Sequence, residues 1–478
     1  MKNLLKAARS LTAPADSTDT LTLCRRTQRL SLWEGALWSV MWGFGETYIA
    51  PYALFLNAGS MAMAFIGTGP VLIAAVAQLV SASAQNRIGK RLPVMLTGTT
   101  TQALIYLPLF ILPAVLPSGG VAVMLGMVAV SFFALGFSVP AWMSLMGDVV
   151  EPESRGSYFS NRTRVVMCVM LASMLIAGWI INRWKACGHA AAGFGFLFSI
   201  AFLVRMISVL FLRRHYDAPV QKPRTEDYFS FLDFIRATPR SNFARFSFSV
   251  AMMHGSAQIA GPFFAVYMLR DLHWSYLQFT INMAVFLMAQ SLFVRWWGAL
   301  GDRHGNRSVL VATSWLMTTL PLFWIFSTDY FVLLLAQVVS GACWSGFNLA
   351  TSNFIYDAVT PAKRARVFSY HNLLTGIFSV IGAMLIGAPL AAHIPATLHL
   401  GGMDIALRSP LLIVFAASTL ARVAVARITL PQFKEVRSSE PISTTQILWR
   451  LGEPLFAQAA EFAPFIRRIY SSSGRQEK

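Results

Sequence analysis

The sequence predicts an all-α membrane protein with twelve transmembrane helices, arranged as two pseudo-symmetric halves of six. The first reason is composition: 55% of the 478 residues are hydrophobic and only 13% are charged, whereas soluble domains average about 25% charged residues. The second reason is a series of twelve apolar runs, most of them long enough to cross the hydrocarbon core of a bilayer as helices. The third is an internal repeat that relates the first six runs to the second six.

The apolar runs divide the chain into five parts. A basic segment, 1–31, precedes the first half, 32–212; a polar linker, 213–242, leads to the second half, 243–430; and a basic, amphipathic tail covers 431–478. We expect the tail to lie on anionic lipid, with partner binding as the alternative. The spans predicted for the first half are 32–56, 61–84, 93–116, 121–147, 163–182 and 193–212. Those predicted for the second half are 243–269, 276–300, 309–326, 330–356, 367–391 and 409–430.

Two further matches support duplication of a six-helix unit. Residues 148–160 (DVVEPESRGSYFS) share Asp, Pro, Arg, Phe and Ser with residues 357–369 (DAVTPAKRARVFS). Pro51 in the first span corresponds to Pro262 in the seventh. Two six-helix halves of the same topology are related by an axis along the membrane normal.

The formal charge of +18 could indicate nucleic-acid binding, but the distribution of the basic residues indicates membrane orientation instead. If the N-terminus is inside, thirty of the 39 Lys and Arg residues fall in segments predicted to be inside. The segments predicted to be outside contain only Arg183, Lys185, Arg270 and Arg408. This bias follows the positive-inside rule. We therefore predict two cytoplasmic termini, contact with the lipid bilayer and no nucleic-acid partner.

The sequence predicts neither an enzyme nor a metal site. Its four cysteines, Cys24, Cys168, Cys187 and Cys343, lack the spacing of a disulfide framework or of a metal-binding motif. We find no nucleophile elbow and no phosphate-binding loop. Residues 1–30 lack the apolar core of a signal peptide. We expect no cofactor, and a proton gradient is the expected energy source.

A short basic turn, Gly298–Arg307 (GALGDRHGNR), lies between two apolar runs. A degraded copy, 82–91 (ASAQNRIGKR), lies at the same place in the first half, with Asn86 where the second half has Asp302. The pattern G-x-x-x-D-R-x-G-x-R resembles the signature loop of the major facilitator superfamily of secondary transporters. The resemblance covers about residues 35–430. It implies alternating access, in which this loop closes a cytoplasmic gate.

The candidate gate residues come from these turns and from the repeated segments at 148–160 and 357–369. Glycine permits tight turns and close helix approach, and Asp302 can pair with an arginine, for which Arg364 is the hypothesis. The alternative is that the basic residues only set topology. The candidate gate residues are Gly298, Asp302, Arg303, Gly305, Arg307, Arg87, Arg91, Arg155 and Arg364.

Glu46 is the main candidate for binding substrate or a proton. At ~1.5 Å per residue it lies near the middle of the membrane, where ionisable residues are costly and are commonly functional. Gly43, Gly45 and Pro51 indicate an irregular or closely packed helix around it. The alternative is a structural carboxylate that neighbouring donors satisfy.

Five more residues are candidates for contact with a small-molecule substrate. His254 and Gln258 lie one turn apart on the seventh span, and Trp344 and Asn348 lie one turn apart on the tenth. Trp142 lies on the fourth. The resemblance implies that the first, fourth, seventh and tenth spans line a central cavity, while helix packing is the alternative for each residue. Arginines within the spans are expected to reach toward the cytoplasmic interface without a functional role: Arg205, Arg245, Arg295 and Arg422.

These features together predict a monomeric secondary transporter of a bacterial inner membrane, coupled to protons through Glu46. The predicted fifth span contains Gly178 but lacks the proline found in antiporters of the family, so symport is favoured over proton–drug antiport. Two alternatives stay open: an uncoupled facilitator, and a non-transporting sensor, lipid-handling or assembly protein. Substrate identity and the direction of transport stay open as well.

Overall fold

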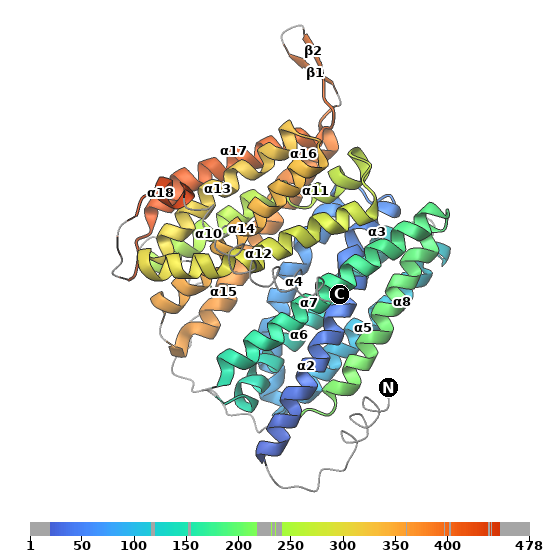
Figure 1. Ribbon diagram of the computed structural model, residues 1–478, viewed down its shortest axis with the longest axis vertical. Helices are drawn as coiled ribbons and strands as arrows, with labels where there is room; N and C mark the ends of the chain where they lie inside the picture. The colour runs from blue at the N-terminus through green and yellow to red at the C-terminus, as the bar shows by residue number, and fades with distance from the viewer. Residues whose placement is uncertain are drawn as a thin grey trace, which may run out of the picture.

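Apolar runs separated by short polar turns fold into long helices, and these pack as two halves (Figure 1). The computed structural model describes residues 20–115, 120–151, 154–217, 231, 235, 241–359, 361–395, 397–400, 403–437, 440 and 442–449. Within these ranges, the side chains of residues 20, 82, 86, 110–115, 361–366, 398–400, 403–406 and 448–449 are outside the description.

The first half contains six transmembrane units, the first of which is interrupted. Its helix α2 begins well before residue 32, because the polar start of the helix extends beyond the apolar run. The elements are α2 (Thr20–Phe44), the 3-10 turn η1 (Glu46–Tyr48), α3 (Ile49–Phe55), α4 (Ser60–Ile88), α5 (Leu92–Val115), α6 (Gly120–Val149), α7 (Arg155–Ala186) and α8 (Ala190–Leu212).

The second half repeats this plan, with interruptions in its first and fifth units. The first unit is α10 (Asn242–Gln258), α11 (Phe263–Val266) and the π-helical turn η4 (Tyr267–Asp271). The next three are α12 (Tyr276–His304), α13 (Asn306–Phe326) and α14 (Tyr330–Ala358). The fifth is α15 (Pro361–Val380), the π-helical turn η5 (Ile381–Gly387) and α16 (Ala388–His393), and the sixth is α17 (Leu411–Thr429) with η6 (Leu430–Gln432).

Two small elements lie outside these twelve units. An antiparallel hairpin of β1 (Thr397–Leu400) and β2 (Met403–Ala406) projects from one end of the bundle (Figure 1). The short helix α18 (Thr444–Trp449) lies near the other end, beside α13. We call the end with the hairpin the hairpin face. The basic face is the opposite end, which carries the turns Arg87–Arg91 and Asp302–Arg307.

The outer surface of the bundle suits lipid rather than water. Large apolar side chains point outward, including Phe326, Leu385 and Leu420, which is 70% exposed. Nine of the helical segments in the described part of the chain are long and apolar enough to cross a membrane. Such exposed apolar surface is stable where hydrocarbon replaces water as the solvent.

The interruptions in the first and seventh units fall at equivalent places. Helix α2 gives way to η1 just before Pro51, and α10 ends just before Pro262, which is the N-cap of α11. Proline cannot donate the backbone hydrogen bond that a continuous helix needs, so each proline favours a break in its helix. The two breaks lie opposite each other at the centre of the molecule.

The two halves are joined on the hairpin side and separated on the basic side. One buried apolar cluster includes residues of both halves, such as Tyr52, Phe194, Phe263 and Phe415. The remaining clusters of the described residues each stay within one half, one in the first half and two in the second. Figure 1 shows α7 and α12 diverging toward the basic face. The cavity between the halves is therefore closed toward the hairpin face.

Specific contacts hold the hairpin side closed. The Tyr48 hydroxyl lies 2.7 Å from Thr280 Oγ1 across the two halves. A Cβ added to Gly67 of α4 would lie 2.6 Å from Pro262 Cγ, so only glycine permits this approach. The Lys185 ammonium lies 5.0 Å from the ring centroid of Tyr276, a cation–π distance.

Candidate functional site

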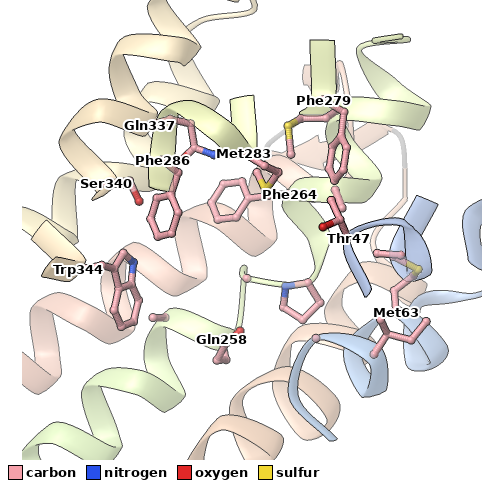
Figure 2. Close-up of a pocket in the computed structure, with 18 of the residues that line it drawn as sticks. Thr47, Met63, Gln258, Phe264, Phe279, Met283, Phe286, Gln337, Ser340 and Trp344 are labelled. Atoms are coloured by element: carbon pink, nitrogen blue, oxygen red, sulfur yellow. The ribbon is translucent and has the colours of Figure 1, made fainter. Parts of the chain in front are cut away.

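A cavity of about 510 Å³ lies between the halves, at the level of the helix breaks. Glu46 and Thr47 of η1 line it from the first half, and Gln258 lines it from the end of α10. Figure 2 shows Thr47 and Met63 on one side, with Gln258, Ser340 and Trp344 on the other. The interrupted helices therefore bring polar groups of both halves to one space.

Most of the cavity wall is apolar and aromatic. Only Glu46 and Arg422 are charged among the described residues that line it. The polar remainder consists of hydroxyl and amide groups, including Ser340 and Gln337. The large apolar lining residues are Met63, Phe132, Phe264, Met268, Phe279, Met283, Phe286, Trp324 and Trp344.

Glu46 is held in place by donors from two neighbouring helices. Its Oε1 accepts hydrogen bonds from the Tyr106 hydroxyl of α5, at 2.7 Å, and from Ser131 Oγ of α6, at 3.3 Å. Tyr106 reaches it because Gly45 leaves room: a Cβ there would lie 2.6 Å from the Tyr106 ring. Glu46 Oε2 is buried without a protein partner. The carboxyl group is thus held through Oε1, and Oε2 is left without a hydrogen bond.

A separate buried polar network lies on the basic-face side of Glu46. Arg205 of α8 donates from Nε to Gln102 Oε1 at 3.0 Å and from Nη1 to Glu34 Oε1 at 3.1 Å. Arg162 of α7 pairs with Glu34 Oε2 at 3.3 Å. The prediction that Arg205 reaches the interface is wrong, because α2 and α5 cover it and supply its acceptors. Arg245 and Arg295 are exposed, in agreement with that prediction.

Two of the five predicted contact residues, Gln258 and Trp344, line the central cavity with Glu46. The His254 ring contacts the Trp344 ring, with centroids 5.0 Å apart and ring planes tilted by 52°, and His254 is not among the lining residues described. Asn348 lies one turn beyond Trp344 on the same face of α14; it is exposed and is not among the described lining residues.

Trp142 belongs to a different space. It lines a second cavity of about 200 Å³ inside the first half, near the basic face. The Arg162 guanidinium lies 4.3 Å from its ring centroid, and Glu34, Trp38 and Arg205 share the lining. Trp142 therefore does not join the central site.

Sequence reasoning missed Thr47 and Arg422. Thr47 corresponds to Gln258 at the same repeat offset that relates Pro51 to Pro262, so the repeat contained the signal for it. Arg422, expected to reach the interface, is buried instead because α10 and α13 pack over it. The sequence contained only a weak indication that Arg422 is buried: Ser418, a possible hydrogen-bond acceptor for it, lies one turn earlier on the same face of α17.

The predicted gate residues of the second half bind the segment that follows α17. Arg303 Nε donates to Glu440 Oε2 at 2.8 Å, and this guanidinium lowers the pKa of the Glu440 carboxyl. The backbone N–H of Arg307 donates to Glu435 Oε2 at 2.6 Å. Gly305 has φ +85°, which favours glycine at this turn. Gly298 has ordinary space around it, so close helix approach does not require a glycine there.

Asp302 lies nearest to an arginine that the sequence did not suggest. Arg437 Nη1 is 3.8 Å from Asp302, and Arg437 Nη2 is 2.8 Å from Asp357. The side chain of Arg364 lies outside the described residues, so an Asp302–Arg364 pair stays a prediction. Ile447 of α18 is buried beside α13, whereas residues 450–478 of the predicted lipid-binding tail are outside the description.

The predicted gate residues of the first half bond within that half. Arg91 pairs with Asp148 at 2.7 Å. Arg155 Nη2 donates to the Gly147 carbonyl at 2.5 Å, and Arg87 is exposed. The described contacts of the turns on the basic face thus lie within one half or the other.

Comparisons with known proteins agree with this fold. A family model described as Major Facilitator Superfamily matches residues 35–252 and 246–460. The MFS antiporter QDR3 of Candida albicans is 23% identical over 124 residues, a match that covers 24% of this chain and only 18% of that relative.

Solved structures are similar over most of the chain. The nucleoside transporter NupG matches with a TM-score of 0.63 at 14% identity, over 86% of this chain and 100% of NupG. A bacterial homologue of the iron transporter ferroportin, in an inward-facing state, matches with a TM-score of 0.63 at 14% identity, over 85% and 98%. At these identities the likeness establishes the fold alone. The family match extends over both helical halves: the protein belongs to the major facilitator superfamily and is an integral membrane transporter.

Proposed function

We propose that this protein is a proton-coupled secondary transporter that moves a small amphipathic solute by alternating access. The observation that carries the proposal is Glu46, a carboxyl group in the wall of the central cavity whose Oε2 has no protein partner. Ionisable groups within a membrane commonly mark substrate or proton pathways. The network of Gln102, Arg205 and Glu34 supports a role in proton movement, because it places polar groups on the basic-face side of Glu46.

The shape and lining of the cavity support the substrate class. A volume of about 510 Å³ falls in the range of small-molecule sites. Aromatic rings and methionine side chains suit an apolar body, since both bury large adaptable surfaces. The cavity lies within one chain, which supports a monomer as the working unit.

The distribution of basic residues supports the orientation. Because the positive-inside rule places basic connections in the cytoplasm, we assign the basic face to the cytoplasm of a bacterial cell, with the protein in the inner membrane. Both chain ends then lie inside. In this orientation the described conformation, closed on the hairpin side, is inward-facing.

The test is transport by purified protein in proteoliposomes. A thermal-shift screen of metabolites and drugs first selects ligands, because a compound that binds only the folded state stabilises it. The wild type should then concentrate a selected ligand when a proton gradient is imposed. Glu46→Gln should let the ligand equilibrate without accumulation and without pH dependence. Glu151→Gln, which removes an exposed carboxyl at the end of α6, should behave as the wild type.

Three outcomes would contradict parts of this proposal. If Glu46→Gln still accumulates ligand with unchanged pH dependence, Glu46 is not the coupling residue. Equilibration without accumulation by the wild type would indicate an uncoupled facilitator. Ligand binding without any flux would indicate a sensor or assembly role.

A further inference from the structure

We propose that the second-half wall of the central cavity is an anion-binding subsite centred on Arg422. The ligand class is an organic anion, with a carboxylate or comparable acidic group attached to an apolar body. That this ligand is the transported substrate rests on the transport function proposed above. The binding site itself does not depend on that function.

Arg422 is a buried cation without an acidic partner among the described residues. It is 3% exposed and lines the cavity. Its Nε lies 3.2 Å from Ser418 Oγ, its Nη1 donates to the Met317 carbonyl at 2.7 Å, and its Nη2 donates to the Ala257 carbonyl at 3.3 Å. All three acceptors are uncharged. A guanidinium has five N–H donors, so this set leaves two for another partner.

The neutral acceptors compensate the charge only in part. Ala257 lies at the C-terminal end of α10, where the helix dipole supplies about half a negative charge. Desolvation of a full positive charge costs several kcal/mol, and a counter-charge offsets this cost. An anion in the adjoining cavity would supply that counter-charge.

Neighbouring donors favour the same ligand. Gln258, Ser340 and Trp344 line the wall of the second half and can donate to acidic oxygens. Glu46, the other charged lining residue, belongs to the first half. An anionic group should therefore bind toward the second half, while its apolar body contacts the aromatic and methionine side chains.

The competing explanation is a structural brace. Arg422 connects α17 to α10 and α13 through backbone carbonyls, and this connection alone could explain its burial. A brace predicts that loss of the guanidinium lowers the affinity of the cavity for every ligand by the same factor. An anion subsite predicts a loss that depends on ligand charge.

The test uses three probes with the same apolar body: 4-phenylbutyrate, 4-phenylbutan-1-ol and 4-phenylbutylamine. Binding to the purified full chain is measured by calorimetry at pH 7 and constant ionic strength. A hydrogen bond to a charged group contributes about 1.5–3 kcal/mol, so the butyrate should bind at least about tenfold more tightly than the alcohol. The amine can pair with Glu46 instead, so its affinity should not fall when Arg422 is replaced.

Variants separate charge from structure. Arg422→Gln should reduce the advantage of the butyrate to less than about threefold and leave the affinity of the alcohol unchanged. Arg422→Lys should retain part of the advantage, because it keeps the charge but loses the planar donor set. Arg295→Gln, which removes an exposed arginine of α12, should match the wild type.

The proposal is overturned if the wild type binds the butyrate no more tightly than the alcohol, a comparison that needs no variant to fold. An equal loss for all three probes in Arg422→Gln would establish the brace instead. Transport measurements distinguish failure of the subsite from failure of the transport function. Flux without anion preference would remove the subsite and keep the transporter, whereas Arg422-dependent anion binding without flux would keep the subsite and remove the transport function.

Discussion

Glu46 owes its position to two small residues and one large one. Gly45 leaves space for the Tyr106 ring, and Ser131 adds a second donor from α6. Because Glu46 lies in a short 3-10 turn rather than in a continuous helix, its side chain is directed by these neighbours. The proton-binding role proposed for Glu46 should therefore be sensitive to Gly45, Tyr106 and Ser131.

Removal of the shortest of these hydrogen bonds should impair transport. A hydrogen bond to a charged group contributes about 1.5–3 kcal/mol, so Tyr106→Phe should lower proton-driven uptake by at least about tenfold. Tyr52→Phe is the matched control: its hydroxyl donates to the Leu109 carbonyl at 3.0 Å, in the same core but away from Glu46. Equal uptake by both variants would show that Tyr106 does not position Glu46.

The place of a residue along its helix was predictable from the sequence, whereas the direction of its side chain was not. Counting along the first span predicts Glu46 near the middle of the membrane, and the structure has it in the wall of the cavity between the halves. The same counting placed Arg205 and Arg422 within reach of the interface, yet both are buried. Which way an arginine points depends on the helices that pack against it, and this information is spread over distant parts of the chain.

At the scale of elements, the broken first and seventh helices form the centre of the site. Their breaks place Thr47 and Gln258 at the cavity, and Pro262 packs against Gly67 of α4. The prolines marked both breaks in the sequence. The hairpin of β1 and β2 was not predicted, because its strands are too short to show a periodic pattern.

Enlargement of Gly67 should open the hairpin side. Overpacking costs about 1–3 kcal/mol, so Gly67→Leu should shift the population toward the state that is open on the hairpin side by about tenfold or more. Spin labels at Cys187 and at Arg408→Cys, one in each half on the hairpin face, should then move apart, with the other three cysteines replaced. Gly147→Leu is the control, since a Cβ there meets nothing within 4 Å. An unchanged distance in Gly67→Leu would contradict the prediction.

Attachment of α18 beneath α13 should depend on pH through Glu440. Because Arg303 lowers the pKa of this carboxyl, the contact stabilises docking above about pH 4.3, the ordinary pKa of a glutamate. It is lost as the pH falls through the lowered value. Hydrogen exchange in residues 442–449 should therefore be faster in Glu440→Gln than in wild type at pH 7, and this difference should shrink as the pH falls through the lowered pKa. A difference that does not shrink on acidification would contradict this account.

At the scale of the whole molecule, the repeat predicted two halves but not the state in which they pack. Both end states of alternating access use the same sequence, so composition and spacing contain no information about which is populated. The inter-half contacts of Tyr48, Gly67 and Lys185 distinguish them here. They all lie toward the hairpin face.

A covalent link between the halves should arrest the cycle. A Cβ on Gly376 of α15 would lie 3.4 Å from Leu72 Cβ of α4, close to the spacing of a disulfide. The oxidised Leu72→Cys/Gly376→Cys protein should bind ligand from the basic face yet transport none, and reduction should restore transport. Transport by the fully oxidised protein would show that these helices need not separate.

The placement of Glu46 and Arg422 on opposite halves of one cavity has an electrical consequence. If the empty carrier holds one negative and one positive side chain, their charges cancel. If the loaded carrier holds a protonated Glu46 and an anion on Arg422, the charges cancel again. Moving one charge across a membrane changes its energy by about 2.3 kcal/mol per 100 mV of potential. Voltage would therefore neither drive nor oppose the return of the empty carrier or the movement of the loaded carrier. The cell could then use this protein at any membrane potential, with acidity alone setting the accumulation ratio.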